Sequence, residues 1–233
     1  LQSQERYETQ EEICQVAAEY RRRGIGLDGI VLDWCSWEDD MWGQKSFDAS
    51  RFPDPAGMIQ TLHDEDVHFM ISIWPNMDPK CENHKEMKEK NLLLPFSDIY
   101  NARTEQARKC YWEQAKRGLY QYGVDAWWCD SSEPFTPEWS HTERVEPALQ
   151  YEEYNRTAGD YLGEEHTNDF ALYHARAIYE GQRSEEKGSD KRVFNLTRSA
   201  WTGQQKYGAV MWSGDTAASW ETLRRQIPAG LNF

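Results

Sequence analysis

Residues 126–130, with the sequence AWWCD, form a short apolar run that ends on a carboxylate. A run of this length that is rich in aromatic residues is typical of a buried strand. The segment before it, about 104–122, has the spacing of a helix and is followed by Gly123, a residue that commonly ends helices. We therefore expect a unit in which a helix leads into a buried strand with a polar residue at its end.

The same unit recurs along the chain in both directions. Apolar residues at helical spacing predict helices at about 11–23, 56–66, 169–183 and 219–226. Short apolar runs predict strands at 30–34, 68–74, 193–198 and 209–215, and we expect long polar loops at 78–89 and 131–163. Buried strands that alternate with helices indicate a parallel sheet with helical crossovers.

The polar residues at the strand ends distinguish a closed barrel from an open sheet. Five predicted strands carry such a residue or an aromatic one at the C-terminal edge, namely Asp33, Trp74, Asp130, Arg198 and Asp215. A barrel gathers these edges around one mouth, where the active sites of this fold lie. No GxGxxG or Walker motif follows any of the strands. The α/β fold class that we predict is therefore a (β/α)8 TIM-type barrel.

Composition narrows the range of partners. The 233 residues carry a net charge of −14, which would repel nucleic acid, and no apolar stretch is long enough to suggest a membrane partner. Five cysteines without CxxC spacing favour a reducing compartment, so we expect a cytoplasmic protein. The histidines form no HExxH pattern, so we expect no metal and no cofactor.

The 11 tryptophans suit sugar binding, because pyranose rings pack on aromatic faces.

Two of the strand-end carboxylates are candidates for glycoside hydrolysis, which needs one group to attack and one to protonate the leaving oxygen. Asp130 and Asp215 each follow a tryptophan-containing apolar run. An aspartate at a strand end also commonly caps the next helix or turn, and position alone leaves both interpretations open.

Four motifs together resemble glycoside hydrolase family 31, and the resemblance extends over about residues 5–233. They are VLDW at 31–34, WCDSSE at 128–133, LTRS at 196–199 and WSGD at 212–215. The resemblance implies that Asp130 is the nucleophile, kept ionised by Arg198, and that Asp215 is the acid/base, kept protonated by burial and by its neighbour's charge. It implies that Asp33 and Arg198 hold sugar hydroxyls.

The same resemblance assigns the walls of the sugar pocket to Trp74, Trp128 and Trp212, for which core packing is the alternative. Glu133 is either a partner that orients Arg198 or a plain helix-start carboxylate. Ser131 and Ser132 depart from the family's usual residues after the nucleophile, and the departure concerns the shape of the pocket.

The family's barrel continues beyond the acid/base strand, so we expect residues 1–233 to be one partial barrel domain that lacks the last strands and the flanking β-sandwich domains. The function expected for the whole enzyme is that of a retaining exo-α-glycosidase acting on terminal α-xylosyl or α-glucosyl groups of an oligosaccharide or glycoside, with xylose favoured. A non-catalytic or sugar-binding remnant, and a metal-dependent barrel hydrolase, are the alternatives. An open barrel also exposes strand edges, which predicts possible homo-oligomers.

Overall fold

The computed structural model describes residues 1–133, 147–186, 188 and 190–232. Its centre is a parallel sheet of six strands in consecutive order. These strands are β1 (Gln2–Ser3), β2 (Gly29–Leu32), β3 (His68–Ile73), β4 (Ala126–Cys129), β5 (Asn195–Thr197) and β6 (Ala209–Met211). Each strand pairs in parallel with the next one along the chain. This is the strand order of a (β/α)8 barrel.

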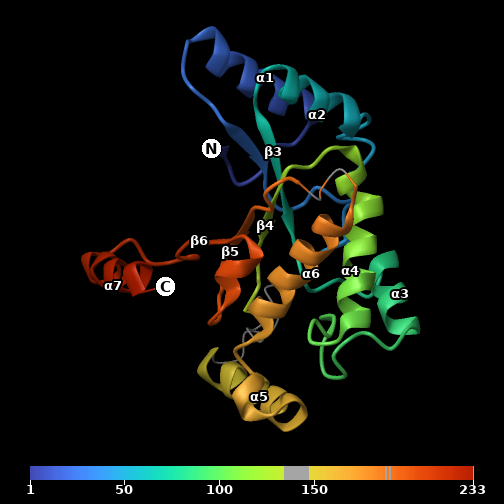
Figure 1. Cartoon of the computed structure of the whole chain (residues 1–233), viewed down its shortest axis with the longest axis vertical. Helices are drawn as coiled ribbons and strands as arrows, with labels where there is room; N and C mark the ends of the chain where they lie inside the picture. Colours follow the sequence, from blue (N-terminus) through green and yellow to red (C-terminus); the bar gives the residue numbers. More distant parts are fainter. Residues whose placement is uncertain (134–146, 187, 189, 233) are drawn as a thin grey trace.

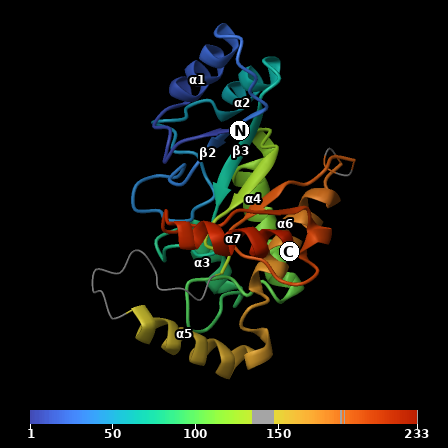
Figure 2. The same cartoon turned by 90° about the vertical axis from the view of Figure 1, so that its left-hand side faces the viewer.

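Helices connect the strands, and α4 (Glu105–Gly118) and α6 (Phe170–Ser184) lie side by side along one face of the sheet (Figure 1). The other helices are α1 (Gln10–Arg22), α2 (Pro55–Asp64), α3 (Glu82–Glu89), α5 (Pro147–Leu162) and α7 (Trp220–Asn232). Short 3-10 turns occupy Tyr120–Tyr122, Glu164–His166 and Gln204–Tyr207. Helices α1 and α2 lie at one end of the sheet and α5 lies at the other (Figure 2).

Side-chain caps explain where three of these helices begin. Thr9 Oγ1 accepts a hydrogen bond from the backbone N–H of Glu12 at 3.2 Å at the start of α1. Asp54 does the same for Gly57 at 2.9 Å, directly before the proline that opens α2. Thr104 caps α4 through the N–H of Ala107. Each cap satisfies a backbone donor that the first turn of a helix leaves free.

The two predicted long loops each contain a helix that the sequence prediction missed. Helix α3 lies within 78–89, and its N-cap residue Cys81 makes no side-chain capping hydrogen bond. Helix α5 lies within the second loop, whose part at 134–146 falls outside the described residues. The prediction of two long polar loops was therefore wrong where these helices lie. Helix α3 lacks both apolar residues at helical spacing and a capping side chain, whereas α5 carries Tyr154, Ala158 and Leu162 at helical spacing.

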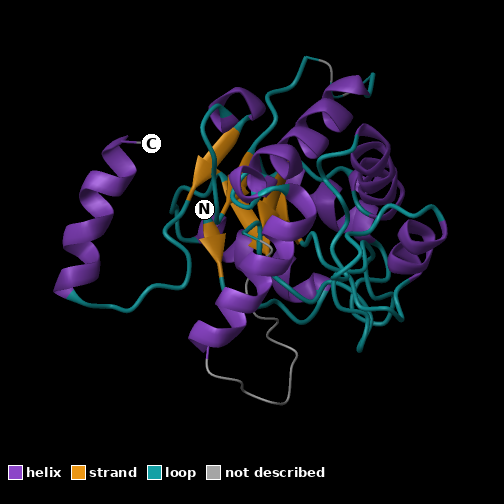
Figure 3. Cartoon of the chain, turned by 90° about the horizontal axis from the view of Figure 1, so that it is seen from below, coloured by secondary structure: helices purple, strands orange, loops and turns teal. Residues whose placement is uncertain are grey.

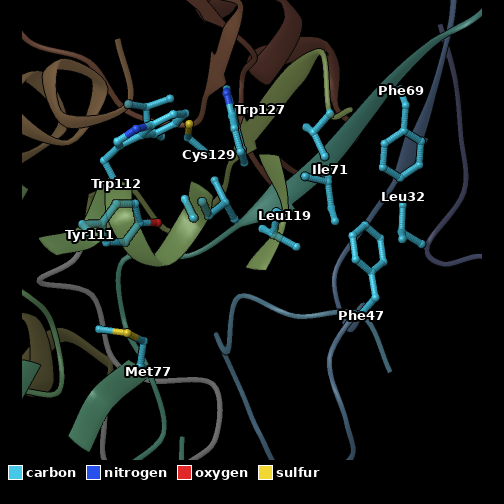
Figure 4. Close-up of a cluster of buried hydrophobic side chains, with 14 of the residues drawn as sticks. Leu32, Phe47, Phe69, Ile71, Met77, Tyr111, Trp112, Leu119, Trp127 and Cys129 are labelled. Carbon is cyan, nitrogen blue, oxygen red and sulfur yellow. The ribbon is translucent and has the colours of Figure 1, made fainter. Parts of the chain in front are cut away.

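The sheet has two different faces. Ile71, Trp127 and Cys129 point toward the covering helices and join a large core that includes Tyr111 and Trp112 of α4 (Figure 4). A much smaller apolar cluster lies on the opposite face, which is the inside of the barrel; it is formed by Val31, Met70, Ala126, Trp128, Phe194 and Leu196. Because successive strand residues alternate between faces, every second residue from these positions projects inward.

The chain leaves the sheet after β6. Figure 3 shows α7 standing apart from the body of the molecule, and Trp220 at its start is 86% exposed. Strand β6 ends at Met211 rather than at 215, so Asp215 lies on the segment that leads to α7. Within the described ranges, no helix combines the length and the apolar character needed to span a lipid bilayer.

Candidate active site

The register of the sheet places four of the predicted site residues at one level. Ile73, Cys129, Thr197 and Met211 are neighbours across the last rung of strands β3 to β6. Their successors in the chain are Trp74, Asp130, Arg198 and Trp212. All four project from the same face of the sheet as Trp128 and Leu196, which belong to the inner cluster, because side chains alternate between the two faces along a strand. Strand geometry alone therefore directs them to the mouth of the barrel.

Arg198 joins the predicted catalytic carboxylates. Its Nη1 lies 3.1 Å from Asp130 Oδ1 and 3.3 Å from Asp215 Oδ2, and its Nη2 lies 2.6 Å from Glu133 Oε1. The two aspartate oxygens can therefore be no farther apart than the first two distances combined. The Arg198 side chain is only 9% exposed, so its guanidinium is largely shielded from water, most of all where it meets Asp130. Glu133 contacts Arg198, as one of the two roles considered for it from sequence requires.

Burial changes the acidity of two carboxyl groups at this edge. It raises the pKa of Asp130 above its usual value, although the guanidinium of Arg198 opposes the change. Burial also raises the pKa of Asp33 to about 6, with a further contribution from the negative charges of Asp130 and Asp215. Asp33 follows Leu32, the last residue of β2, and Leu32 pairs with Ile71 of β3, so Asp33 lies at the same edge of the sheet as Asp130. The expected lowering contribution of Arg198 to the pKa of Asp130 is present, but the cost of burying the charge is larger and the net pKa is raised.

Asp215 differs from the prediction in its surroundings. Its side chain is 79% exposed, so the expected burial of this carboxyl group was wrong for the described chain. The physical reason is the early end of β6, which leaves Asp215 on a connecting segment instead of in the sheet. Its contact with Arg198 nevertheless keeps it beside Asp130.

The three predicted pocket tryptophans fall into two groups. Trp128 and Trp212 pack on each other with ring centroids 4.8 Å apart, and both are partly exposed at the mouth. Trp74 is 5% exposed and packs edge-on against Trp42 at 4.8 Å. Trp42 also contacts Trp34, which follows Asp33 in the chain. Trp42 could not be identified from the sequence, because it lies in a loop and not at the end of a predicted strand.

The backbone is strained beside two of the site aspartates. Ser131, next to Asp130, has φ of 49°, and Cys35, two residues after Asp33, has φ of 72°. Non-glycine residues in this region cost about 1–3 kcal/mol and persist where the surrounding structure imposes them, often at functional sites. Asp130 and Asp33 each accept a hydrogen bond from the N–H of the following residue, at 2.8 and 2.7 Å. The strained turns therefore help to aim both carboxylates.

Comparison with known proteins relates this site to one family. The sequence model of the glycosyl hydrolases family 31 TIM-barrel domain matches residues 1–233. An alpha-xylosidase of Saccharolobus solfataricus is 40% identical over 240 residues, covering 100% of this chain and 30% of that protein. The crystal structure of the GH31 alpha-xylosidase from Xanthomonas citri superposes with a TM-score of 0.84 at 36% identity, covering 99% of this chain and 26% of that chain.

A GH31 alpha-xylosidase from a soil metagenome, solved in complex with xylose, superposes with a TM-score of 0.76 at 34% identity, covering 98% of this chain and 33% of that chain. The chain thus spans a third or less of the length of these three relatives. The matches confirm the predicted fold class, a (β/α)8 barrel of which six strands are described.

Proposed function

Because the chain belongs to glycosyl hydrolase family 31, we propose that the whole protein is a retaining exo-α-glycosidase that releases terminal α-xylosyl groups in preference to α-glucosyl groups. The observation that carries the proposal is the Arg198 cluster, in which one guanidinium contacts both Asp130 and Asp215 on the inner side of the strand ends. Retaining glycosidases need two carboxyl groups roughly 5–5.5 Å apart, a separation that this arrangement permits.

In the first step, a carboxylate oxygen of Asp130 attacks the anomeric carbon and forms a glycosyl ester. The bond to the leaving oxygen breaks, and the protonated Asp215 delivers its proton to that oxygen. In the second step, Asp215 removes a proton from water as the water attacks the anomeric carbon, and Asp130 leaves as a carboxylate. Arg198 balances the charge that Asp130 carries before and after the ester forms.

Sugar binding is assigned to residues around the same mouth. We infer that Asp33 and Arg198 hold hydroxyl groups of the terminal sugar, while Trp74, Trp128 and Trp212 form apolar walls. The preference for xylose is supported by the names of three relatives at 34–40% identity, each called an alpha-xylosidase. Excluding the CH2OH group of glucose is worth only about 1–3 kcal/mol, so we expect a preference of about 10- to 200-fold rather than absolute selectivity.

The test uses the protein expressed from its complete reading frame, assayed with aryl α-xylosides and aryl α-glucosides. Asp130→Ala should abolish hydrolysis of every substrate. Asp215→Ala should slow substrates with poor leaving groups far more than those with activated ones, which need no protonation. Undiminished turnover by Asp130→Ala would refute the nucleophile assignment. NMR of the first-formed anomer checks retention, and an inverted product would refute the two-step route.

The alternative of a non-catalytic barrel segment is favoured by one observation, the 79% exposure of Asp215 within residues 1–233. A general acid must be held within hydrogen-bond distance of the leaving oxygen, and an exposed side chain on a connecting segment lacks that support. We therefore expect the 233-residue chain alone to bind sugar weakly and to lack hydrolysis. Turnover by that segment equal to that of the whole protein would contradict this.

A further inference from the structure

A closed ring of hydrogen bonds ties together the loops that carry Asp130 and Arg198. Ser132 Oγ lies 3.0 Å from Thr197 Oγ1, and the backbone N–H of Ser199 donates to Ser132 Oγ at 2.9 Å. Thr197 Oγ1 in turn donates to the carbonyl of Ser199 at 2.9 Å. Ser132 is fully buried and Thr197 is 1% exposed, so water does not compete for these bonds.

The direction of each bond in the ring follows from counting hydrogens. Thr197 has one hydroxyl hydrogen, which goes to the carbonyl of Ser199. Its contact with Ser132 must then be one in which Ser132 donates and Thr197 accepts. Ser132 receives the N–H of Ser199 in return. Both hydroxyl groups therefore donate once and accept once, and a buried ring in which every member is satisfied is rigid.

The ring encloses the backbone on both sides of Arg198, since Thr197 and Ser199 are its neighbours in the chain. Ser132 stands between the strained Ser131 and Glu133, the residue that holds Arg198 Nη2. The ring therefore fixes the two loops relative to each other at the point where the guanidinium must reach its carboxylates.

Gln204 supports the same loop from the far side. Its side-chain amide donates to the carbonyl of Ser199 at 3.3 Å, and its Oε1 accepts the N–H of Trp201 at 3.0 Å. Gln204 is fully buried. The carbonyl of Ser199 thus receives two donors, which fixes the turn that follows Arg198.

We propose that Ser132 and Thr197 are positioning residues, whose hydroxyl ring sets the distance between Arg198 and Asp130 and so tunes the nucleophile. The proposal deepens the function proposed above and rests on it. Neither hydroxyl is free to contact the sugar, because both are buried and fully used in the ring. A displacement of about 1 Å in a catalytic group can cost about 100-fold in rate, so loss of the ring should appear in kcat.

The experiment compares variants that remove a hydroxyl with one that keeps it, all in the protein made from the complete reading frame. Ser132→Ala and Thr197→Val open the ring, whereas Thr197→Ser preserves its hydroxyl and loses only a methyl group. Ser36→Ala is the matched control, because Ser36 is also a buried serine in a loop after a strand and donates to the carbonyl of Ser46 at 3.0 Å. Thermal unfolding of each variant measures the structural cost separately.

We expect Ser132→Ala and Thr197→Val each to lower kcat about 10- to 100-fold with KM little changed. The double variant should be no worse than either single one, because the ring is already open. The acid limb of kcat/KM should move to higher pH, since Arg198 no longer opposes the rise in the pKa of Asp130. Thr197→Ser should retain most of the activity.

Two results would overturn the proposal. One is a loss of kcat in Ser36→Ala as large as that in Ser132→Ala, which would show a general effect of removing a buried hydroxyl. The other is a crystal structure of each ring variant in which Arg198 Nη1 stays 3.1 Å from Asp130 Oδ1, the distance found here. The structures decide the matter independently of activity, whereas an inactive wild-type protein would count against the proposed function.

Discussion

Replacement of Lys45 by methionine should stabilise the protein at pH 6 and lose that advantage as the pH rises. Lys45 lies in the loop between β2 and α2 and is only 3% exposed. Its Nζ is 3.4 Å from Gln114 Oε1, 3.4 Å from Met77 Sδ and 4.2 Å from the centre of the Tyr111 ring. No ion pair found among the described residues includes it. Burial lowers the pKa of its ammonium group from 10.5 to about 7.

The magnitude follows from the difference between the two pKa values. A decrease from 10.5 to about 7 makes the charged ammonium cost about 5 kcal/mol in the folded state, at about 1.4 kcal/mol per pH unit. The cost is fully present below pH 7 and disappears as the pH rises toward the unfolded value. Lys45→Met removes the cost but leaves Gln114 Oε1 without this donor, a loss of about 1–3 kcal/mol. The net gain at pH 6 is therefore about 3 kcal/mol.

The assay is thermal unfolding of wild type and variant from pH 6 to pH 9. A gain of about 3 kcal/mol corresponds to a rise in Tm of roughly 6–12 °C for a domain of this size. The difference in Tm should shrink steadily above pH 7, because deprotonation then relieves the wild type. The buried cysteines and tyrosines are present in both proteins, so the effect of their titration on Tm cancels when the two Tm values are subtracted.

Lys85→Met is the matched control. Lys85 is 51% exposed and pairs with Glu82 on the surface of α3, so its removal should change Tm by only a degree or two at any pH. A Tm difference for Lys45→Met that stays constant from pH 6 to pH 9 would refute the reasoning, as would a variant less stable than wild type at pH 6.

Three further predictions concern the site. The KM for aryl α-xylosides should rise as the pH falls below about 6, where Asp33 gains a proton. Asp33→Asn should have a high KM at every pH. A wild-type KM that is independent of pH from 5 to 7 would contradict the role of Asp33 in binding sugar hydroxyls. Gly214→Ala should lower kcat about 10-fold, because Gly214 has φ of 74° and an added Cβ would lie 3.3 Å from Arg198 Cγ. Unchanged kinetics would show that Arg198 can accommodate the added Cβ without leaving its position. Arg198→Lys should lower kcat/KM at least 100-fold, because a single ammonium cannot hold Asp130 and Glu133 through separate nitrogens; near-normal activity would mean that charge alone suffices.

Much of the fold could be predicted from local patterns. The apolar runs at 68–74 and 126–130 became β3 and β4 with their ends shifted by a single residue. Helix α3 could not be predicted in this way, whereas α5 carries Tyr154, Ala158 and Leu162 at helical spacing. Helix α3 has one buried apolar residue, Met87, and buries the polar Asn83 and His84 instead, so the apolar period that predicts helices is absent.

By itself, the sequence determined the strand-helix order, the inward alternation and the identity of the residues that follow each strand, because these depend on local apolar spacing. Only the tertiary structure decided that Arg198 contacts Asp130, Glu133 and Asp215 together, that Asp33 is buried enough to hold its proton to about pH 6, and that Asp215 stays exposed. The physical reason is that burial, charge coupling and the Ser132 ring depend on contacts between residues that are far apart in the chain, about 65 positions in the ring. Such contacts produce no periodic pattern in the sequence.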